Sequence, residues 1–322
     1  ARAPGAEARA RQVLDDRLDH RPELAATRAW LTDLGVDAVL SVTPFAIQEL
    51  VLLRATRDLG LPAATSILSF DNLTTRPPLP TTFDRYIVWN RYNRDEVLRT
   101  HPTVGADAVA VTGPAQFDFY ADPSWVEPAE TWRARVGLAP GERSILYGAG
   151  PLSVAPHEDQ YVDDLVAALE DGRLPADVRV VLRRHPTDPP GRWERFASSP
   201  VVRSDDPGPV GTTDLRPGQA DMGRHQVVDL CSALAHTEVH VNVSSTMTLD
   251  GACFDKPQIG PAYDRRGRRR HRRRAIDLYR REHFLPIVAS GGLELSRRPE
   301  ELIEQVASAL ADPGRLAAER RA

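Results

Sequence analysis

The sequence has little of what metal sites, disulfide frameworks and membrane spans require. It contains two cysteines, Cys231 and Cys253, and their spacing matches neither a metal-ligand motif nor a disulfide framework. No apolar run approaches the roughly 18–20 residues of a transmembrane helix, and no signal peptide is visible at the start. We therefore expect a protein of the reducing cytoplasm that carries no metal.

Lysine is almost absent, because Lys256 is the only one among 41 basic residues. The formal net charge is −4, which gives no global electrostatic case for binding nucleic acid. Hydrophobic residues make up 41% and charged residues 27% of the 322 positions, as is typical of a globular protein with two domains.

Strands and helices alternate in the first half of the chain. The pattern predicts helices over 1–34, 45–59 and 91–100, and strands over 36–42, 62–68, 85–89 and 108–112. Short connections in such a series favour a parallel sheet with helices on its faces. The chain opens in Ala- and Arg-rich sequence without a first strand. This beginning is compatible with a fragment, so the N-terminal domain can be incomplete.

The alternation of strands and helices stops over 117–142, a segment that prolines interrupt, and we place the linker there. The predicted domains are therefore residues 1–125 and 126–322. In the second domain we expect strands over 144–147, 178–182, 239–243, 256–259 and 285–289, and helices over 158–170, 227–235, 275–282 and 299–310. Residues 189–226 are predicted to be rich in loops. The fold class is α/β, with two Rossmann-like open parallel sheets.

Three strand ends in the second half carry polar or flexible sequence. They are Gly148-Ala149-Gly150, Arg184-His185-Pro186 and Ser244-Ser245-Thr246. Ligands of open α/β sheets bind beyond the carboxyl ends of strands, so these loops would share one crevice if their strands are neighbours. Each also has an ordinary structural interpretation, as a turn, a strand stop and a helix cap.

Their chemistry suits an activated donor with a diphosphate. Gly148 and Gly150 would let a ligand approach the backbone, and His185 with Arg184 can donate hydrogen bonds to phosphate. Ser244–Thr246 offer hydroxyl and N–H donors where a helix begins. One turn later, Asp250 can accept hydrogen bonds from ribose hydroxyls, unless it is simply an exposed helix residue.

The motifs resemble those of a known enzyme group. His185-Pro186 and Ser244–Thr246 look like the "HP" and "SS/ST" motifs of GT-B glycosyltransferases of the capsule and teichoic-acid type, such as CDP-glycerol glycerophosphotransferases. Residues 242–260, NVSSTMTLDGACFDKPQIG, are also similar to UDP-GlcNAc 2-epimerase-like and surface-polysaccharide proteins. Segments 69–74 (SFDNLT), 87–90 (IVWN) and 111–118 (VTGPAQFD) add to the pattern. Asp250 departs from it, because a glutamate is usual there.

The resemblance implies that a nucleotide-activated donor binds in the second domain and an acceptor in the first. It implies no cofactor and no metal, since protein groups stabilise the leaving diphosphate. An inverting enzyme also needs a base within about 3 Å of the acceptor hydroxyl. Asp71 is the first candidate and Glu49 and His157 follow, although Asp71 can equally form an Asx turn.

The run Arg265–Arg274 contains eight arginines in ten positions. It can contact an anionic acceptor, such as a lipid-linked diphosphate or an acidic glycan. It can instead contact an anionic membrane surface at the inner face of the plasma membrane, where each basic residue adds about 1 kcal/mol, or be a solvated loop. Nucleic acid is disfavoured, because no aromatic residues interleave.

We therefore expect a metal-independent GT-B glycosyltransferase. It would move a sugar or glycerophosphate from a nucleotide-activated donor to a surface polysaccharide, a capsule or a related glycan or lipid-linked acceptor. Two alternatives stay open, a sugar-nucleotide enzyme similar to UDP-GlcNAc 2-epimerase and a non-catalytic nucleotide-sugar-binding assembly subunit. The sequence selects neither the nucleobase nor the sugar.

Overall fold

The chain folds into two compact units, Ala1–Gln116 and Phe117–Ala322, so the division falls before the predicted boundary at 125/126. The computed structural model describes residues 6–189, 191–208, 222–265 and 274–321. Each unit has its own parallel sheet and its own hydrophobic core. The predicted fold class, two open parallel-sheet α/β domains, is confirmed.

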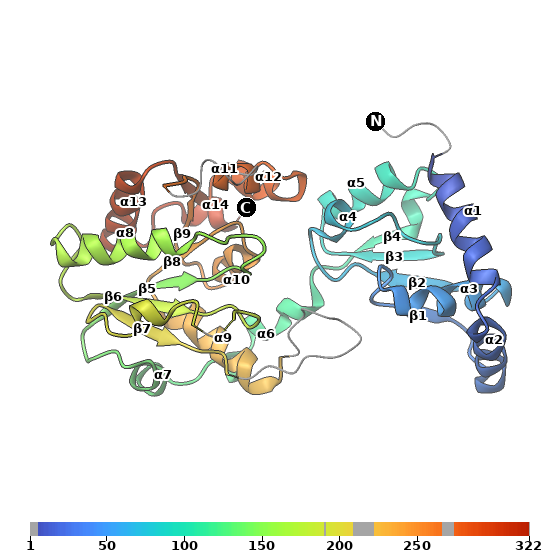
Figure 1. The fold of residues 1–322 in the computed structure, drawn as a ribbon, viewed down its shortest axis with the longest axis horizontal. Helices are drawn as coiled ribbons and strands as arrows, with labels where there is room; N and C mark the ends of the chain where they lie inside the picture. Colours follow the sequence, from blue (N-terminus) through green and yellow to red (C-terminus); the bar gives the residue numbers. More distant parts are fainter. Residues whose placement is uncertain (1–5, 190, 209–221, 266–273, 322) are drawn as a thin grey trace. The chain divides into compact units, whose positions relative to one another are not determined.

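Unit 1 has a four-stranded parallel sheet in which spatial order follows chain order (Figure 1). Its strands are β1 (Val39–Ser41), β2 (Ala63–Ser66), β3 (Arg85–Val88) and β4 (Val109–Val111). Its helices are α1 (Ala6–Asp19), α2 (Glu23–Leu34), α3 (Leu50–Asp58), α4 (Asn72–Thr75) and α5 (Arg91–Thr100), with 3₁₀ turns η1 (Ile47–Glu49) and η2 (Ala106–Ala108). The helix expected over 1–34 is two helices, because Pro22 stands at the beginning of α2.

The two faces of the unit 1 sheet differ in burial. Tyr86 of β3 is in register with Thr65 and Val109, and all three residues are buried. Tyr86 and Val109 belong to the core to which α3 and α5 contribute. On the opposite face, Leu40 of β1 is 58% exposed and its strand partner Ala64 is only partly buried. Parallel sheets normally bury both faces, so this face of unit 1 is unusually open.

Unit 2 has a six-stranded parallel sheet in the order β10-β9-β8-β5-β6-β7. Its strands are β5 (Arg143–Gly148), β6 (Val178–Arg183), β7 (Val202–Asp205), β8 (Val239–Asn242), β9 (Gln258–Pro261) and β10 (Leu293–Ser296). The first strand of the unit, β5, lies in the middle beside β8, and the chain builds outward in both directions from there. This reversal of strand order is the switch point beside which doubly wound sheets bind ligands.

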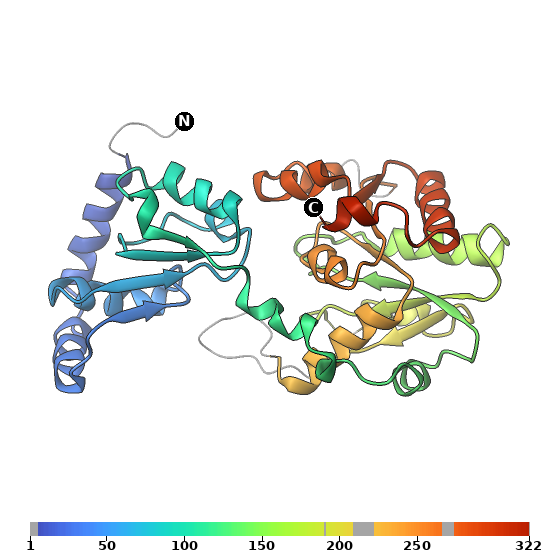
Figure 2. The same ribbon diagram turned by 180° about the vertical axis from the view of Figure 1, so that it is seen from behind.

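Helices cover both faces of the unit 2 sheet (Figures 1 and 2). Side chains alternate along β5, so that Ile145 and Tyr147 belong to one core and Leu146 to another. The first core includes α8 (Asp159–Glu170) and α13 (Pro299–Ala311), and the second includes α7 (Ala129–Val136) and α9 (Arg224–His236). The remaining elements are α6 (Asp118–Ala121), α10 (Met247–Cys253), α11 (Ala275–Leu278), α12 (Leu285–Ser290), α14 (Ala317–Arg321), η3 (Ala115–Phe117), η4 (Pro123–Trp125), η5 (Glu194–Phe196) and η6 (Glu282–Phe284).

Two predictions for the second half are wrong. The apolar run 285–289 forms α12 instead of a strand, because Pro286 fits the first turn of a helix and Gly291 ends it in a left-handed conformation. The last strand is β10, which follows that glycine. Within the predicted loop-rich segment 189–226 lies β7, an edge strand too short to give a periodic signal.

The predicted linker region, 117–142, is largely ordered structure of unit 2. Its helix α7 ends in a left-handed glycine, Gly137, and fully buries Trp132. None of the described helices combines the length and the apolar character needed to cross a membrane.

Gly251 tests the packing of α10 on the sheet. A Cβ there would lie 2.2 Å from both Gln258 Nε2 and His240 Nδ1, two buried atoms 3.0 Å apart. Gly251→Ala should therefore destabilise the protein by roughly 1–3 kcal/mol in urea unfolding, whereas an unconstrained helix glycine would gain about 1 kcal/mol. Increased stability of this variant would contradict the packing described.

Candidate functional site

The three predicted loops follow three neighbouring strands. Gly148, the last residue of β5, is in register with Asn242 of β8 on one side and with Arg183 of β6 on the other. The loop containing Gly150 therefore lies between the loops of His185 and Ser244. The condition set by the sequence analysis, that these strands be neighbours, is met.

The turn at Ser244 adopts a strained conformation fixed by Tyr279. Ser244 has φ of 46°, which is uncommon for a residue other than glycine. Its N–H donates to Tyr279 Oη over 3.2 Å, and that hydroxyl in turn donates to the carbonyl of Asn242 over 3.2 Å. The Ser244 hydroxyl donates to the carbonyl of Leu278 over 3.3 Å. Residues following the arginine run thus hold the turn.

Asn242 organises the rest of the turn. Its Oδ1 accepts from the N–H of Ser245 over 3.3 Å and from Thr248 Oγ1 over 2.9 Å, while its Nδ2 is buried without a partner among the described residues. Thr246 is exposed at the beginning of α10. Because α10 has only seven residues, the hydroxyl groups of the turn and the N–H of Thr246 matter more than the helix dipole.

Gly148 allows β5 and α10 to meet. A Cβ at this position would lie 2.5 Å from Met247 Sδ, so a larger residue would require the Met247 side chain or the start of α10 to shift. This explains the first glycine of Gly148-Ala149-Gly150 as a packing requirement. It also couples the loop after β5 to the Ser244 turn.

Gly150 is held by a buried charged network that sequence reasoning missed. Its N–H donates to Glu158 Oε1 over 2.9 Å, and its carbonyl accepts from Arg192 Nη1 over 2.8 Å. Arg192 Nη2 also bonds Glu158 Oε1 over 2.7 Å. Burial raises the pKa of Glu158 to about 8. In the sequence, Glu158 is indistinguishable from an ordinary acidic residue at a helix start.

The same arginine reaches the loop of His185. Arg192 Nη1 bonds Asp188 Oδ1, and Asp188 Oδ2 accepts from the N–H of His185 over 3.1 Å and from Trp193 Nε1 over 2.7 Å. The N–H of Thr187 donates to His185 Nδ1 over 3.2 Å, which assigns the proton of a neutral ring to Nε2. Burial lowers the pKa of His185, which favours that neutral form.

Two predicted donor-site residues have other partners. Arg184 forms an ion pair of 2.6 Å with Asp206. Asp250 is buried rather than exposed, and its carboxyl group is hydrogen-bonded to Tyr120. Burial raises the pKa of Asp250 to about 7. A ribose contact by Asp250 would require Tyr120 to move, and it stays a prediction.

The predicted catalytic residues lie in local networks. Asp71 Oδ1 accepts from Ser69 Oγ over 2.6 Å, and its Oδ2 from Thr75 Oγ1 over 3.1 Å, an arrangement close to the turn that was its structural alternative. Glu49 accepts from Ser41 Oγ, at the end of β1. His157 lies half-buried in the loop between Gly150 and α8.

Eight residues of the arginine run, 266–273, lie outside the described residues. Its two ends are anchored. Arg265 pairs with the buried Asp164 over 2.5 Å, and the N–H of Arg274 donates to Asp277 over 3.1 Å. Within the described part of the chain, no three His, Cys, Asp or Glu side chains are placed to hold a metal ion.

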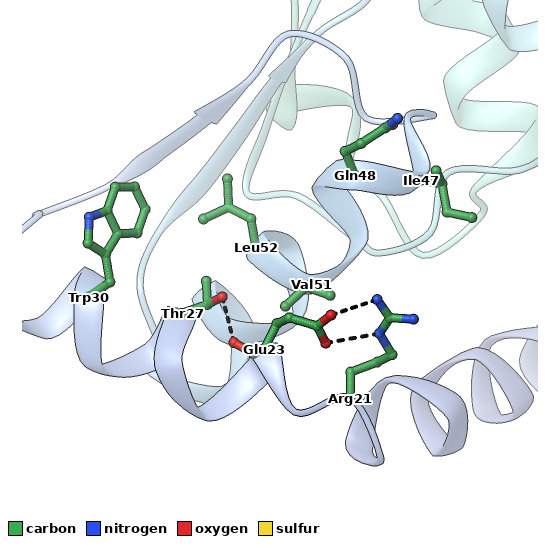
Figure 3. Close-up of a pocket in the computed structure, with 8 residues that line it drawn as sticks. All are labelled: Arg21, Glu23, Thr27, Trp30, Ile47, Gln48, Val51 and Leu52. Carbon is green, nitrogen blue, oxygen red and sulfur yellow. Dashed lines mark hydrogen bonds and ion pairs between the residues drawn. The ribbon is translucent and has the colours of Figure 1, made fainter. Parts of the chain in front are cut away.

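Unit 1 has an open groove of about 440 Å³ between α2, η1 and α3, shown in Figure 3. Trp30 lies at one end and the ion pair of Arg21 and Glu23 at the other. No candidate residue of the sequence analysis lines it, although Glu49 belongs to the same turn as Ile47 and Gln48.

Similar structures exist, but sequence similarity is low. No protein-family model and no curated protein matches the chain. A putative UDP-N-acetylglucosamine 2-epimerase from Listeria monocytogenes aligns over 95% of this chain and 72% of its own, with TM-score 0.60 and 13% identity. UDP-GlcNAc 2-epimerase from Neisseria meningitidis, solved with UDP-GlcNAc bound, aligns over 99% and 78%, with TM-score 0.59 and 13% identity.

A third similar structure carries a different activity in its name. The glycosyltransferase from Rickettsia africae aligns over 94% of this chain and 75% of its own, with TM-score 0.55 and 12% identity. At such identities the likeness shows the fold alone. That fold is of the GT-B class, as the resemblance of the motifs implied.

The contact between Gly148 and Met247 can be tested by a double-mutant cycle. Gly148→Ala should destabilise the chain by roughly 1–3 kcal/mol, because the methyl group meets Met247 Sδ. Met247→Ala removes the obstacle, so the loss caused by Gly148→Ala should be smaller in that background. Losses that simply add, measured by urea unfolding, would show that a side chain at position 148 does not meet Met247.

Asp250 predicts a pH dependence of stability. Its pKa is about 7 in the folded chain against an ordinary 3.8, so between these values the folded state binds more protons than the unfolded state. Its contribution to stability is therefore complete below pH 3.8 and is lost as the pH rises through 7.

The matched variant is Asp250→Asn, which keeps the shape and cannot ionise. Between about pH 5 and pH 8 the wild type should lose roughly 2 kcal/mol relative to this variant. The unfolding free energies of both proteins in urea measure this difference. A difference that does not change with pH would refute an ionisable Asp250 in this environment.

Proposed function

We propose that unit 2 binds a nucleotide-activated sugar at the carboxyl edge of its sheet, and that the chain is a glycosyltransferase. The observation that carries this proposal is the position of three loops with polar or glycine-containing sequence at neighbouring strand ends, beside the switch point between β5 and β8. Doubly wound sheets bind nucleotides at this position.

The donor groups suit a diphosphate. Neutral His185 can donate from Nε2, since Nδ1 already accepts from Thr187. On the other side of the Gly150 loop, Ser245 offers its hydroxyl group, and Thr246 offers its hydroxyl and its N–H group. Fixed donors of this kind stabilise the charge that develops on a leaving nucleoside diphosphate. The motifs His185-Pro186 and Ser244–Thr246 favour the capsule and teichoic-acid type, to which CDP-glycerol glycerophosphotransferases belong.

For unit 1 we propose acceptor binding. Asp71 remains the candidate base, because its Oδ2, which accepts from Thr75 Oγ1, keeps a second lone pair for a proton from the acceptor. The arginine run 265–274 would favour an anionic acceptor, such as a lipid-linked diphosphate or an acidic glycan.

A sugar-nucleotide 2-epimerase is the second candidate, because two of the similar structures carry that name. An epimerase needs acid and base groups at the sugar itself. In unit 2, the Glu158 carboxyl group is hydrogen-bonded to the N–H of Gly150 and to Arg192. This leaves His157 and His185 as candidates for the acid and base. This shortage favours transfer over epimerisation.

The donor site predicts a selective loss of nucleotide affinity. His185→Ala, and Ser245→Ala combined with Thr246→Ala, should each raise the dissociation constant of UDP, CDP or GDP about tenfold or more, because each removes donors to phosphate. Calorimetry on purified protein measures this. Thr131→Ala, on the exposed side of α7, is the matched control and should leave affinity unchanged.

Unaltered affinity in the site variants, with circular dichroism showing intact folds, would refute the donor site. Product analysis with nucleotide-activated donors then separates the activities. Transfer to an added acceptor supports a glycosyltransferase, a changed sugar on the same nucleotide supports an epimerase, and binding without turnover supports an assembly subunit.

A further inference from the structure

We propose that Arg192, Glu158 and Asp188 are positioning residues that join the Gly150 and His185 loops into one preorganised phosphate-binding edge. This inference rests on the proposed donor site and assigns a role to residues that would not touch the ligand. It concerns how the edge keeps its shape before a nucleotide arrives.

Arg192 is the only residue of the network that bonds to both loops. Toward the loop after β5, its guanidinium donates to the carbonyls of Gly150 and Ala155, each over 2.8 Å, and to Glu158 over 2.7 Å. Toward the loop after β6, it pairs with Asp188, whose other oxygen accepts from the N–H of His185 over 3.1 Å. A single planar group therefore fixes one loop relative to the other.

The residue types are those that such a junction requires. Only arginine presents several donors in a fixed fork, and here the fork meets two carboxyl groups and two carbonyls. The side chains of Glu158 and Asp188 are 0% exposed and that of Arg192 is 8% exposed. Buried charges of this kind are costly unless fully paired, so the network tolerates few alternative loop conformations.

Gly150 is held from both sides by this network, through its N–H and its carbonyl. The loop glycine thus has a fixed peptide orientation in spite of its intrinsic freedom. His185 is similarly fixed through its N–H, so its ring is presented from a stable backbone. Preorganisation of this kind lowers the entropic cost of binding.

Protonation of Glu158 gives the proposal a second testable consequence, a pH dependence of nucleotide affinity. The groups that face the Glu158 carboxyl are Arg192, Asp188, Tyr147, Tyr161 and Tyr279, of which only Arg192 is positive. Burial raises the pKa of Glu158 to about 8. Above that pH, two carboxylates would share one guanidinium beside the proposed diphosphate, and affinity should fall.

The decisive comparison uses two neighbouring arginines. Arg192→Lys keeps the charge but cannot make the forked contacts. Arg195→Lys is the matched control, because Arg195 pairs with Asp159 and Asp163 on α8 at the surface. Calorimetry with UDP, then CDP and GDP, should show about a tenfold weaker affinity for Arg192→Lys. The control should match the wild type.

If Arg192→Lys does not fold, the variant Glu158→Gln tests the proposal instead. Wild-type affinity should decrease as the pH rises past about 8, and Glu158→Gln should show no such step, a pattern that loss of folding alone would not produce. Equal affinities of Arg192→Lys and the control, or the same pH step in both wild type and Glu158→Gln, would overturn the inference. Failure of the wild type to bind any of the three nucleotides would instead overturn the proposed donor site.

Discussion

The parallel pairing of β5 with β8 is the constraint on which the proposed site depends. It places the first strand of unit 2 in the centre of the sheet, so that the chain builds outward to β7 on one side and to β10 on the other. Gly148 and Asn242 meet at the carboxyl end of this pair. Every candidate donor group of unit 2 is attached to β5, β8 or the adjacent β6.

Buried polar groups hold the loops of this edge. Tyr279 and Asn242 hold the Ser244 turn on one side, and Arg192 holds the Gly150 loop on the other. Buried polar groups stabilise a structure only when they are satisfied, so these contacts specify one loop arrangement. The buried Nδ2 of Asn242, which has no described partner, is the exception at the switch point.

The sequence predicts the frame of this site because hydrophobic periodicity and strand-ending glycines are local signals. The ends of β5, β6 and β8 follow from such signals. Which strands are neighbours does not follow from local signals, so the sequence alone predicts the shared site only on the condition that these strands are neighbours. The roles of Arg192 and Tyr279 could not be predicted from the sequence, because their hydrogen-bond partners are distant in the chain or look like ordinary residues of a turn or a helix start. Asp250 was predicted to bind ribose, with an exposed helix residue as the alternative, but it is buried and hydrogen-bonded to Tyr120 from another segment.

A structure of the chain with UDP or another nucleoside diphosphate bound would show directly whether this edge is the donor site. We expect the diphosphate to lie over Gly148–Gly150, with its oxygens within hydrogen-bond distance of His185 Nε2 on one side and of Ser245 or Thr246 on the other. A nucleotide bound elsewhere on unit 2, or on unit 1, would contradict it.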